Sequence, residues 1–399
     1  MEKKALDRLH FVRTGWELFG LLSLGSAYSS VASCAPLIPT SALKGIGPLG
    51  DPNPAGLRLP SGFVGREIAR SGHRVRRADG SKIDYRWHTF PDGGACFKTD
   101  DGGWIYVSNS EVQVPGAGGA GAIRFDAQGQ VVDAYSILQG TTCNCAGGPT
   151  PWGTWLSCEE IESGYVFECD IYGKKAAEKI PALGRFVHEA VAVDDERQHI
   201  YLTEDRKDGC FYRFTSAGRL EDGRLDLSQG RLEVARVEGG SVSWLEVPNP
   251  TPGLMDTPTR HQVPGSTPFK GGEGIWYHDQ TVYFTTKGDN RVWTYDVIRQ
   301  RLSLRYDYQT APDRMLSGVD NITVTPDGHV LVAEDGDDMQ IVILGPHGDI
   351  YPLVQVVGQD HSEITGPALS PHGQRLYFSS QRGNHRGITY EVTGHLLDL

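Results

Sequence analysis

The segment from Asn144 to Glu160 concentrates side chains that can bind metal ions. Cys145 precedes a Gly-Gly-Pro turn, and a Trp-rich strand then ends in the acidic pair Glu159 and Glu160. An ordinary core strand requires neither the glycines at its start nor two acids at its end. Thiolates suit redox-capable metals, whereas carboxylates suit hard cations such as calcium. The segment therefore predicts part of a metal centre, with a buried or disulfide-bonded thiol as the alternative for Cys145.

A pair of short strands recurs along the chain and would position this segment. The first strand of the pair is recognised at residues 188–194, 272–278, 320–326 and 365–371, and each copy is followed by a polar turn. The second strand begins at residues 104, 154, 200, 282, 330 and 376. Most of these starts are 46 to 50 residues apart, close to the roughly 40–50 residues of a four-stranded propeller blade. The spacing predicts an all-β fold, a β-propeller of about six blades with loop insertions on one face.

One step in this series, from residue 200 to residue 282, is longer than the others. It predicts a loop excursion or a degenerate blade within 215–265, so that seven blades are an alternative. The chain has 50 glycines and 23 prolines in 399 residues, which favours turn-rich β structure over helices. A generic β-sandwich is the competing fold, but it does not explain the regular spacing.

Propeller topology would bring matching positions of the repeat to one central axis. Before the apolar part of the first strand stand Glu189, Glu273, Asn321 and Gly366. The second strand ends in Asn109, Glu159, Glu204 and Glu334, and three of these are followed by Glu160, Asp205 and Asp335. Carboxylates that converge repel each other unless cations lie between them. We therefore expect metal ligands among Cys145, Glu159, Glu160, Glu189, Glu204, Glu273, Asn321 and Glu334, although any single acid could instead be a solvated turn residue.

The formal net charge of −12 disfavours nucleic acid as a partner, because its phosphates would be repelled. An acidic chain suits a protein that holds calcium with carboxylates, and solubility alone would explain the charge equally well. The sequence contains no G-x-S-x-G motif, no P-loop and no H-E-x-x-H motif. Serine hydrolases, P-loop nucleotide hydrolases and zincin proteases are therefore not indicated.

The first 35 residues have the pattern of an export signal. Basic residues precede a short apolar run, and small residues lead to Cys34 as at a lipoprotein processing site. We predict an export or lipoprotein-like segment over 1–35, a linker and surface loop over 36–84, and the catalytic propeller over 85–399. This predicts a periplasmic or other extracytoplasmic location, with possible membrane anchoring through Cys34. A peripheral N-terminal helix is the alternative.

Several of these motifs resemble the PhoX-type phosphatase family, over roughly residues 85–390. The matching pieces are residues 144–148, 150–155, 158–160, 184–186, His188-Glu189, Gly366-Pro367 and Ser370-Pro371. The resemblance implies an exported metalloenzyme, a β-propeller that carries iron (Fe³⁺) and calcium (Ca²⁺) ions on one face and hydrolyses phosphate esters. It implies that Cys145 ligates iron and that Glu159, Glu189 and Glu273 hold metals, which makes Cys145, Glu159 and Glu273 the expected catalytic residues.

The chain departs from that family at residue 271. In the phosphatase branch an arginine that holds the phosphate precedes the glutamate matching Glu273 by two residues, whereas this chain has Gly271. Lys270, Lys287, Arg291 and Arg382 are candidates to replace it, and arginine restored at 271 should raise activity if the missing group is limiting. We predict that Asn109 and Arg382 contact the substrate, although a surface position is the plainer interpretation of Arg382.

The predicted function is an exported, metal-dependent phosphoesterase that acts on small-molecule phosphate esters as a monomer. A calcium-dependent lactonase of the gluconolactonase type is the first alternative, since Glu189, Glu273 and Asn321 would suffice for one Ca²⁺ ion. A non-catalytic propeller of the cell envelope is the second. Metal analysis separates the three, because they predict iron with calcium, calcium alone, and no metal.

Overall fold

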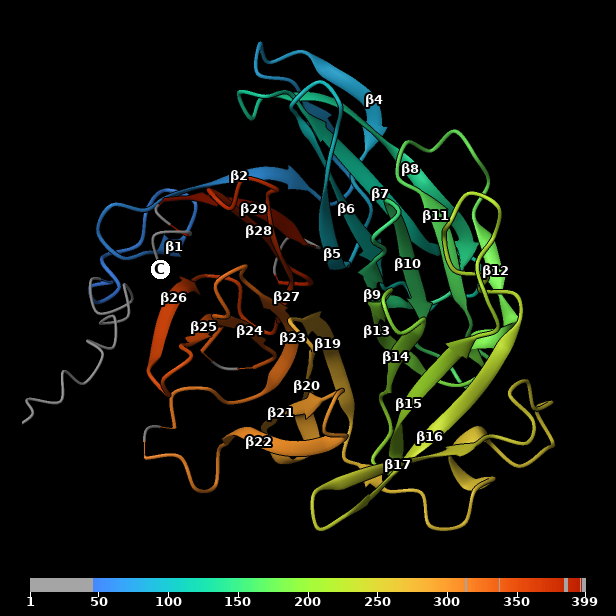
Figure 1. Ribbon diagram of the computed structural model, residues 1–399. Helices are drawn as coiled ribbons and strands as arrows, with labels where there is room; N and C mark the ends of the chain where they lie inside the picture. Colours follow the sequence, from blue (N-terminus) through green and yellow to red (C-terminus); the bar gives the residue numbers. More distant parts are fainter. Residues whose placement is uncertain (1–45, 313, 337, 384–386, 395, 397–399) are drawn as a thin grey trace, which may run out of the picture. The chain divides into compact units, whose positions relative to one another are not determined.

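The computed structural model describes residues 46–312, 314–336, 338–383, 387–394 and 396. Strands dominate this part of the chain, and six antiparallel units of four strands surround a common centre (Figure 1). The predicted export segment over 1–35, including Cys34, lies outside the described residues. Within the described part, no helix is both long and apolar enough to cross a bilayer.

Each unit is a propeller blade, in which the first strand is innermost and the later strands follow outward. Blade 1 consists of β5 (Pro91–Lys98), β6 (Trp104–Ser110), β7 (Gly118–Phe125) and β8 (Val131–Thr141). Blade 2 consists of β9 (Asn144–Pro149), β10 (Thr154–Glu159), β11 (Val166–Asp170) and β12 (Glu178–Ile180). Blade 3 consists of β13 (His188–Asp194), β14 (His199–Glu204), β15 (Gly209–Ser216) and β16 (Gly230–Glu238).

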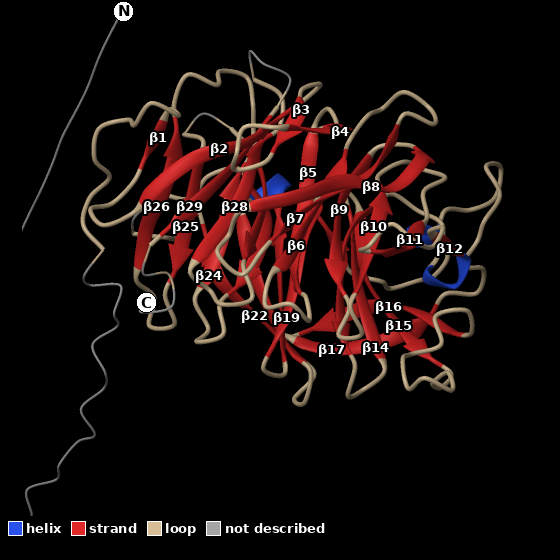
Figure 2. Cartoon of the chain, turned by 90° about the horizontal axis from the view of Figure 1, so that it is seen from above, coloured by secondary structure: helices blue, strands red, loops and turns tan. Residues whose placement is uncertain are grey.

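The second half of the chain repeats this arrangement, which Figure 2 shows from the side. Blade 4 consists of β19 (Gly272–His278), β20 (Thr281–Thr286), β21 (Arg291–Asp296) and β22 (Arg301–Asp307). Blade 5 consists of β23 (Val319–Val324), β24 (Val330–Glu334), β25 (Gln340–Leu344) and β26 (Ile350–Val356). Blade 6 consists of β27 (Ile364–Leu369), β28 (Arg375–Ser380), β29 (Ile388–Thr393) and, on its outer edge, β2 (Val64–Arg70).

The long step in the repeat is a set of extra elements after blade 3, and it holds no further blade. A strand β17 (Ser241–Glu246) pairs with β16 and touches β22 at one residue pair, which joins blades 3 and 4 into one sheet. The short strand β18 (Pro268–Phe269) and the 3₁₀ turn η3 (Thr259–His261) follow in the connection. The predicted loop excursion is therefore confirmed, and the blade count is six.

The N-terminal part of the described chain closes the ring. Strand β2 pairs with β29, and β1 (Leu57–Arg58) pairs with β26. The hairpin of β3 (Arg74–Arg76) and β4 (Lys82–Arg86) follows. The linker predicted over 36–84 is thus wrong for these strands. Proline- and glycine-rich flanks concealed them, and β2 carries three charged residues with only Ala69 buried.

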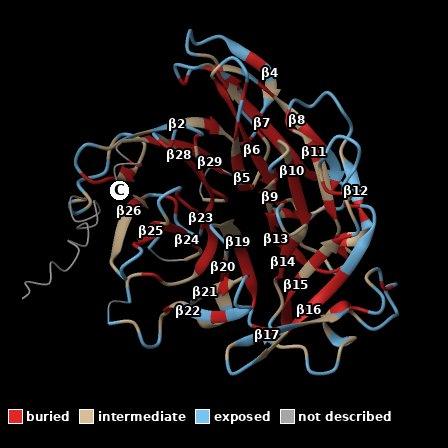
Figure 3. Cartoon of the chain, viewed as in Figure 1, coloured by how far each residue is buried: buried red, intermediate tan, exposed pale blue. Residues whose placement is uncertain are grey.

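Buried residues dominate the strands around the centre (Figure 3), and their apolar side chains form clusters that join neighbouring blades. Aromatic rings stack across the interfaces, as between Tyr106 and Tyr377 at 5.1 Å and between Phe211 and Phe284 at 4.7 Å. The inner strands also contact each other in sequence, and β27 contacts β5 to complete the circle. Buried blade faces thus hold six inner strands in fixed positions around one axis.

Candidate metal centre

A β-bulge near the start of every inner strand positions one side chain at the centre. In blade 3, Glu189 and Ala190 together face Thr203, between the pairs His188–Glu204 and Val191–Leu202. The same register shift recurs in the other blades. The first residues of the six bulges are Asp92, Cys145, Glu189, Glu273, Asp320 and Gly366. A bulge redirects side chains locally, so it presents five potential ligands from five blades.

Small residues close the axis beneath these ligands. A Cβ at Gly274 would lie 2.7 Å from the Asn321 Cα, and one at Gly93 would lie 2.5 Å from the Ala146 Cα. The space that remains along the axis has a volume of about 20 Å³. The bulged ends therefore form one face of the molecule, and the inner strands approach each other closely beneath it.

A second set of side chains reaches the same face from the position directly after each second strand. These residues are Glu111, Glu160, Asp205, Lys287, Asp335 and Gln381. Glu363, directly before β27, adds another carboxylate. Together with Glu363 and Cys143, the two sets form five overlapping groups of three acidic or thiol side chains, with ligand atoms within 4.8 Å of one another. The groups are Glu111/Cys143/Glu160, Cys145/Glu160/Glu189, Asp92/Glu111/Glu363, Glu189/Glu273/Asp320 and Asp320/Asp335/Glu363.

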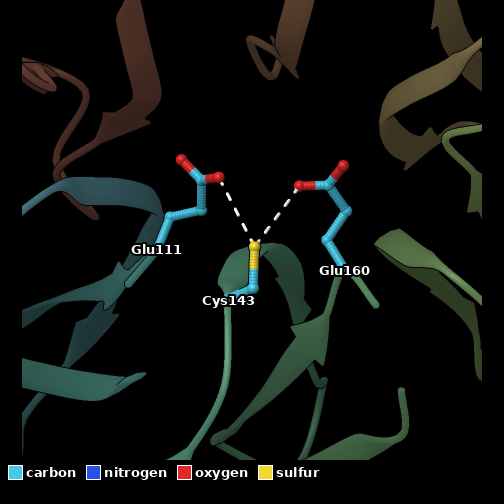
Figure 4. Close-up of side chains that lie close together, drawn as sticks. All are labelled: Glu111, Cys143 and Glu160. Atoms are coloured by element: carbon cyan, nitrogen blue, oxygen red, sulfur yellow. Dashed lines mark hydrogen bonds between the residues drawn. The ribbon is translucent and has the colours of Figure 1, made fainter. Parts of the chain in front are cut away.

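Both cysteines of the Cys-x-Cys sequence belong to these groups. Cys143 Sγ lies 3.5 Å from Glu111 Oε1 and 3.8 Å from Glu160 Oε2 (Figure 4). Cys145 Sγ lies 3.2 Å from Glu189 Oε1. Cysteines 96, 143, 145, 158, 169 and 210 are all free thiols, so the possible disulfides do not form. The two thiols therefore face the carboxylates on one side of the centre.

Mutual repulsion and burial favour the protonated form of these acids. Burial, followed by the charge of neighbouring carboxylates, raises the pKa of Asp92 and Glu189 well above the ordinary range. The same causes raise the pKa of Glu160 to about 8, of Glu363 to about 8 and of Asp320 to about 6. Burial also raises the pKa of the Cys145 thiol, and Asp92 adds to the effect. Cations among these groups would reverse this balance.

Two basic side chains enter the acidic centre. Lys287 Nζ lies 3.4 Å from Glu273 Oε1, 3.6 Å from an Asp320 oxygen and 3.1 Å from an Asp335 oxygen. Burial opposes the charge of this ammonium group, but the attraction of Glu273 and the other acids outweighs it and raises the pKa of Lys287.

Arg382 is the second cation, and Glu111 lies between its guanidinium and the Cys143 thiol. Its guanidinium pairs with Glu111 at 2.7 Å and also with Glu363. The side chain remains 42% exposed, so a ligand on this face can reach it.

Three of the glutamates predicted as metal ligands are not in the five groups, because each is the last residue of a second strand and its side chain holds a loop. Glu159 accepts backbone hydrogen bonds from Thr142 and Tyr165. Glu204 accepts from the Cys210 amide and the Tyr212 hydroxyl and pairs with Arg260, and Glu334 accepts from Ser317. Successive residues of a strand point to opposite sides, so the residue that follows each of them points to the centre. A metal role for these three glutamates stays a prediction that their contacts do not support.

The two predicted asparagines position the ligands of the centre. Asn109 donates to the carbonyls of Cys145 and Ala146, and its Oδ1 accepts from Trp155 and Ser157. All its hydrogen-bonding capacity is thus used, and the predicted contact with substrate has no support here.

Asn321 has a similar supporting place. It donates to Asp320 Oδ1 at 2.8 Å and accepts from the Gly366 amide at 2.6 Å. It therefore orients Asp320. The comparison of the repeats predicted the next residue, Asn321, as the ligand.

The fold and this face define a six-bladed propeller with an acidic, thiol-containing centre suited to metal ions. The sequence model of the alkaline phosphatase PhoX family matches residues 69–165 and 161–383. The chain therefore belongs to the PhoX alkaline phosphatase family.

Several solved structures are similar to this chain. Pseudomonas fluorescens PhoX in complex with vanadate, a transition state analogue, is 17% identical with a TM-score of 0.71, covering 88% of this chain and 97% of that one. A Bacteroides thetaiotaomicron protein of unknown function is 10% identical (TM-score 0.49), covering 87% and 83%. A Xanthomonas campestris gluconolactonase is 12% identical (TM-score 0.45), covering 87% and 99%. No curated protein matches the sequence.

Proposed function

We propose that the protein is an exported phosphoesterase that uses iron and calcium ions at the bulged face. The observation that carries the proposal is the set of five overlapping ligand groups in a chain of the PhoX family. The donors fit such ions. Glu189 is completely inaccessible to solvent, and its Oε2 atom has no hydrogen-bond partner. An ionised carboxylate in that position requires a cation nearby.

The ligand types divide the centre into two halves. Cys145, with Glu160 and Glu189, offers sulfur and oxygen donors suited to iron, and Cys143 provides a second thiol beside it. The groups formed by Asp92, Asp320, Glu363 and their neighbours offer oxygen only, as calcium prefers. When bound, these cations would supply positive charge for phosphate oxygens and would acidify a coordinated water molecule.

The side chains around the ions have separate tasks in this proposal. Arg382 binds an oxygen of the phosphate group, since a guanidinium matches the geometry of such anions. A cavity of about 760 Å³ beside it, lined by Asp335, Gln359, His361 and Ser362 among others, receives the alcohol part of the ester. These linings are polar, which favours a hydrophilic alcohol.

The calcium-dependent lactonase alternative is less well supported. It relies on Glu189, Glu273 and Asn321 around one ion, but both polar ends of the Asn321 amide already bond to Asp320 and Gly366. It also gives no role to the two thiols that face the acids. Export and a monomeric state are further parts of our proposal, and the basic and apolar pattern of residues 1–35 supports the first.

Elemental analysis combined with a substrate panel tests the proposal. Protein purified without chelator should contain iron and calcium and should hydrolyse phosphate esters but not lactones. Cys145→Ala should lose iron and at least about 100-fold in kcat/KM, because a ligand is removed. Cys96→Ala, at a thiol in a different blade interface, is the matched control and should keep both. Full activity in Cys145→Ala, or calcium without iron in the native protein, would contradict the proposal.

A further inference from the structure

Lys287 occupies a place in the repeat where the other blades have acidic or amide side chains. The residue directly after the second strand is Glu111, Glu160, Asp205, Asp335 or Gln381 in the other five blades. Because the blades are equivalent, these side chains approach the centre from corresponding positions. Blade 4 therefore presents a cation at a point where its neighbours present potential metal ligands.

The surroundings of the Lys287 ammonium group are those of a bound cation. Its nitrogen lies between 3.1 and 3.6 Å from oxygens of Glu273, Asp320 and Asp335, which come from two blades. Calcium binds carboxylate oxygens at about 2.3–2.6 Å, so a shift of about 1 Å by each acid would enclose an ion at the same point. Asp320 belongs to two of the ligand groups and links this position to both.

The backbone fixes the lysine in this place. Its amide donates to the Gly271 carbonyl at 2.9 Å, and residues 287–289 form the 3₁₀ turn η4 (Lys287–Asp289). Asp289 is itself paired with Arg291 and does not compete for the ammonium group.

We propose that Lys287 is a built-in cation that takes the place of one divalent ion on the blade 4 and blade 5 side of the centre. The chain consequently binds one ion fewer than its carboxylates could hold, and this side stays neutralised when calcium is removed. The inference rests on the proposed metal centre, but it concerns the number of ions and not the reaction.

Calcium titration of chelator-treated protein tests this role without any activity assay. Lys287→Met should bind one more Ca²⁺ per chain than the native protein, whereas Lys287→Arg, which keeps the charge, should bind the native number. Without calcium, the Tm of Lys287→Met should fall by on the order of 5 °C relative to native protein, and calcium should restore it. Lys207→Met, at an exposed position, is the matched control and should match the native protein in both measurements.

The outcomes separate this inference from the proposed function. If the native protein binds calcium but Lys287→Met binds the same number of ions, Lys287 does not replace an ion and the inference fails. If neither protein binds any ion, the proposed metal centre fails as well. If Lys287→Met does not fold in chelator, both proteins are purified in calcium and their calcium contents are compared. An equal content overturns the inference.

Discussion

At the scale of single residues, Gly271 occupies a position that disfavours a side chain. Its backbone has a φ of +69°, and a Cβ there would lie 3.0 Å from Asp205 Oδ1. Residues with side chains are disfavoured in this left-handed region, by roughly 1–2 kcal/mol. The basic group of this neighbourhood comes instead from Lys287, whose amide is bonded to Gly271.

The structure therefore argues against a benefit from arginine at residue 271. We expect Gly271→Arg to lower the free energy of unfolding by about 1–2 kcal/mol, from backbone strain, and to leave kcat/KM unchanged or lower. Thermal denaturation and phosphate ester hydrolysis measure the two effects. Gly271→Ala isolates the backbone term and should show a similar loss of stability. A rise in kcat/KM for Gly271→Arg alone would instead support the hypothesis that the absence of an arginine at residue 271 limits activity.

Asn109 is not a predicted metal ligand, but loss of its side chain should disturb the position of the ligands. Its buried amide joins the Cys145 and Ala146 carbonyls of blade 2 to β6 in blade 1. Asn109→Ala should lower the free energy of unfolding by about 2–4 kcal/mol, because buried partners lose their hydrogen bonds. Iron content should fall with it.

Chemical denaturation and elemental analysis measure these effects of Asn109→Ala. Asn249→Ala, at an exposed loop position, is the control and should change stability by less than about 0.5 kcal/mol. A stable Asn109→Ala variant with full iron content would show that Asn109 does not position Cys145.

At the scale of elements, the inner strands show what the sequence could predict and what it could not. The strand pairs were predicted almost to the residue, as for β13 and β19, because short apolar runs between turn residues define them. Of the predicted ligands, Cys145, Glu160, Glu189 and Glu273 lie together in the ligand groups, and their metal role stays a prediction. Glu189 and Glu273 stand in recognised copies of the repeat, whereas Cys145 and Glu160 stand in the Asn144–Glu160 motif.

The remaining ligands were missed because they depend on register. The comparison of the repeats predicted Asn321 as the ligand from blade 5, whereas the bulge of β23 presents Asp320 at the centre. A bulge adds one residue to one strand without a sequence signature of its own. Asp92 was missed because the first strand of blade 1, with its adjacent glycines, was not recognised as a copy. Glu111 was missed because Asn109 was taken as the end of the second strand, which ends one residue later at Ser110. Cys143 had a usable signal, since Cys-x-Cys places both thiols on one face of a strand.

At the scale of the whole molecule, the centre couples stability to pH and to calcium. Glu160 and Glu363 have pKa values of about 8 in the folded chain, against about 4.3 for an unfolded glutamate. The folded state therefore holds more protons between about pH 4 and pH 8. Without metals, the contribution of these two groups to the stability of the folded state is greatest below about pH 4. This contribution is lost as the pH rises through 8.

We expect the stabilising effect of calcium to grow as the pH rises. Protons neutralise the centre at low pH, whereas bound ions must do so at high pH, and ligands that bind only the folded state stabilise it. The Tm difference between calcium and chelator should be several degrees larger at pH 8.5 than at pH 5.5. A difference that is constant or that shrinks with rising pH would show that these acids do not bind calcium.

The closure of the ring by β2 has a consequence for how the molecule matures. The outermost strand of blade 6 comes from the beginning of the described chain, and its neighbour β29 comes from the end. The group Asp92/Glu111/Glu363 likewise combines blade 1 with blade 6. A growing polypeptide cannot complete the first arrangement before β29 is synthesised, or the second before Glu363 is. Ion uptake at that junction consequently follows the synthesis of blade 6, and a chain without β27 to β29 would lose the partner strand of β2.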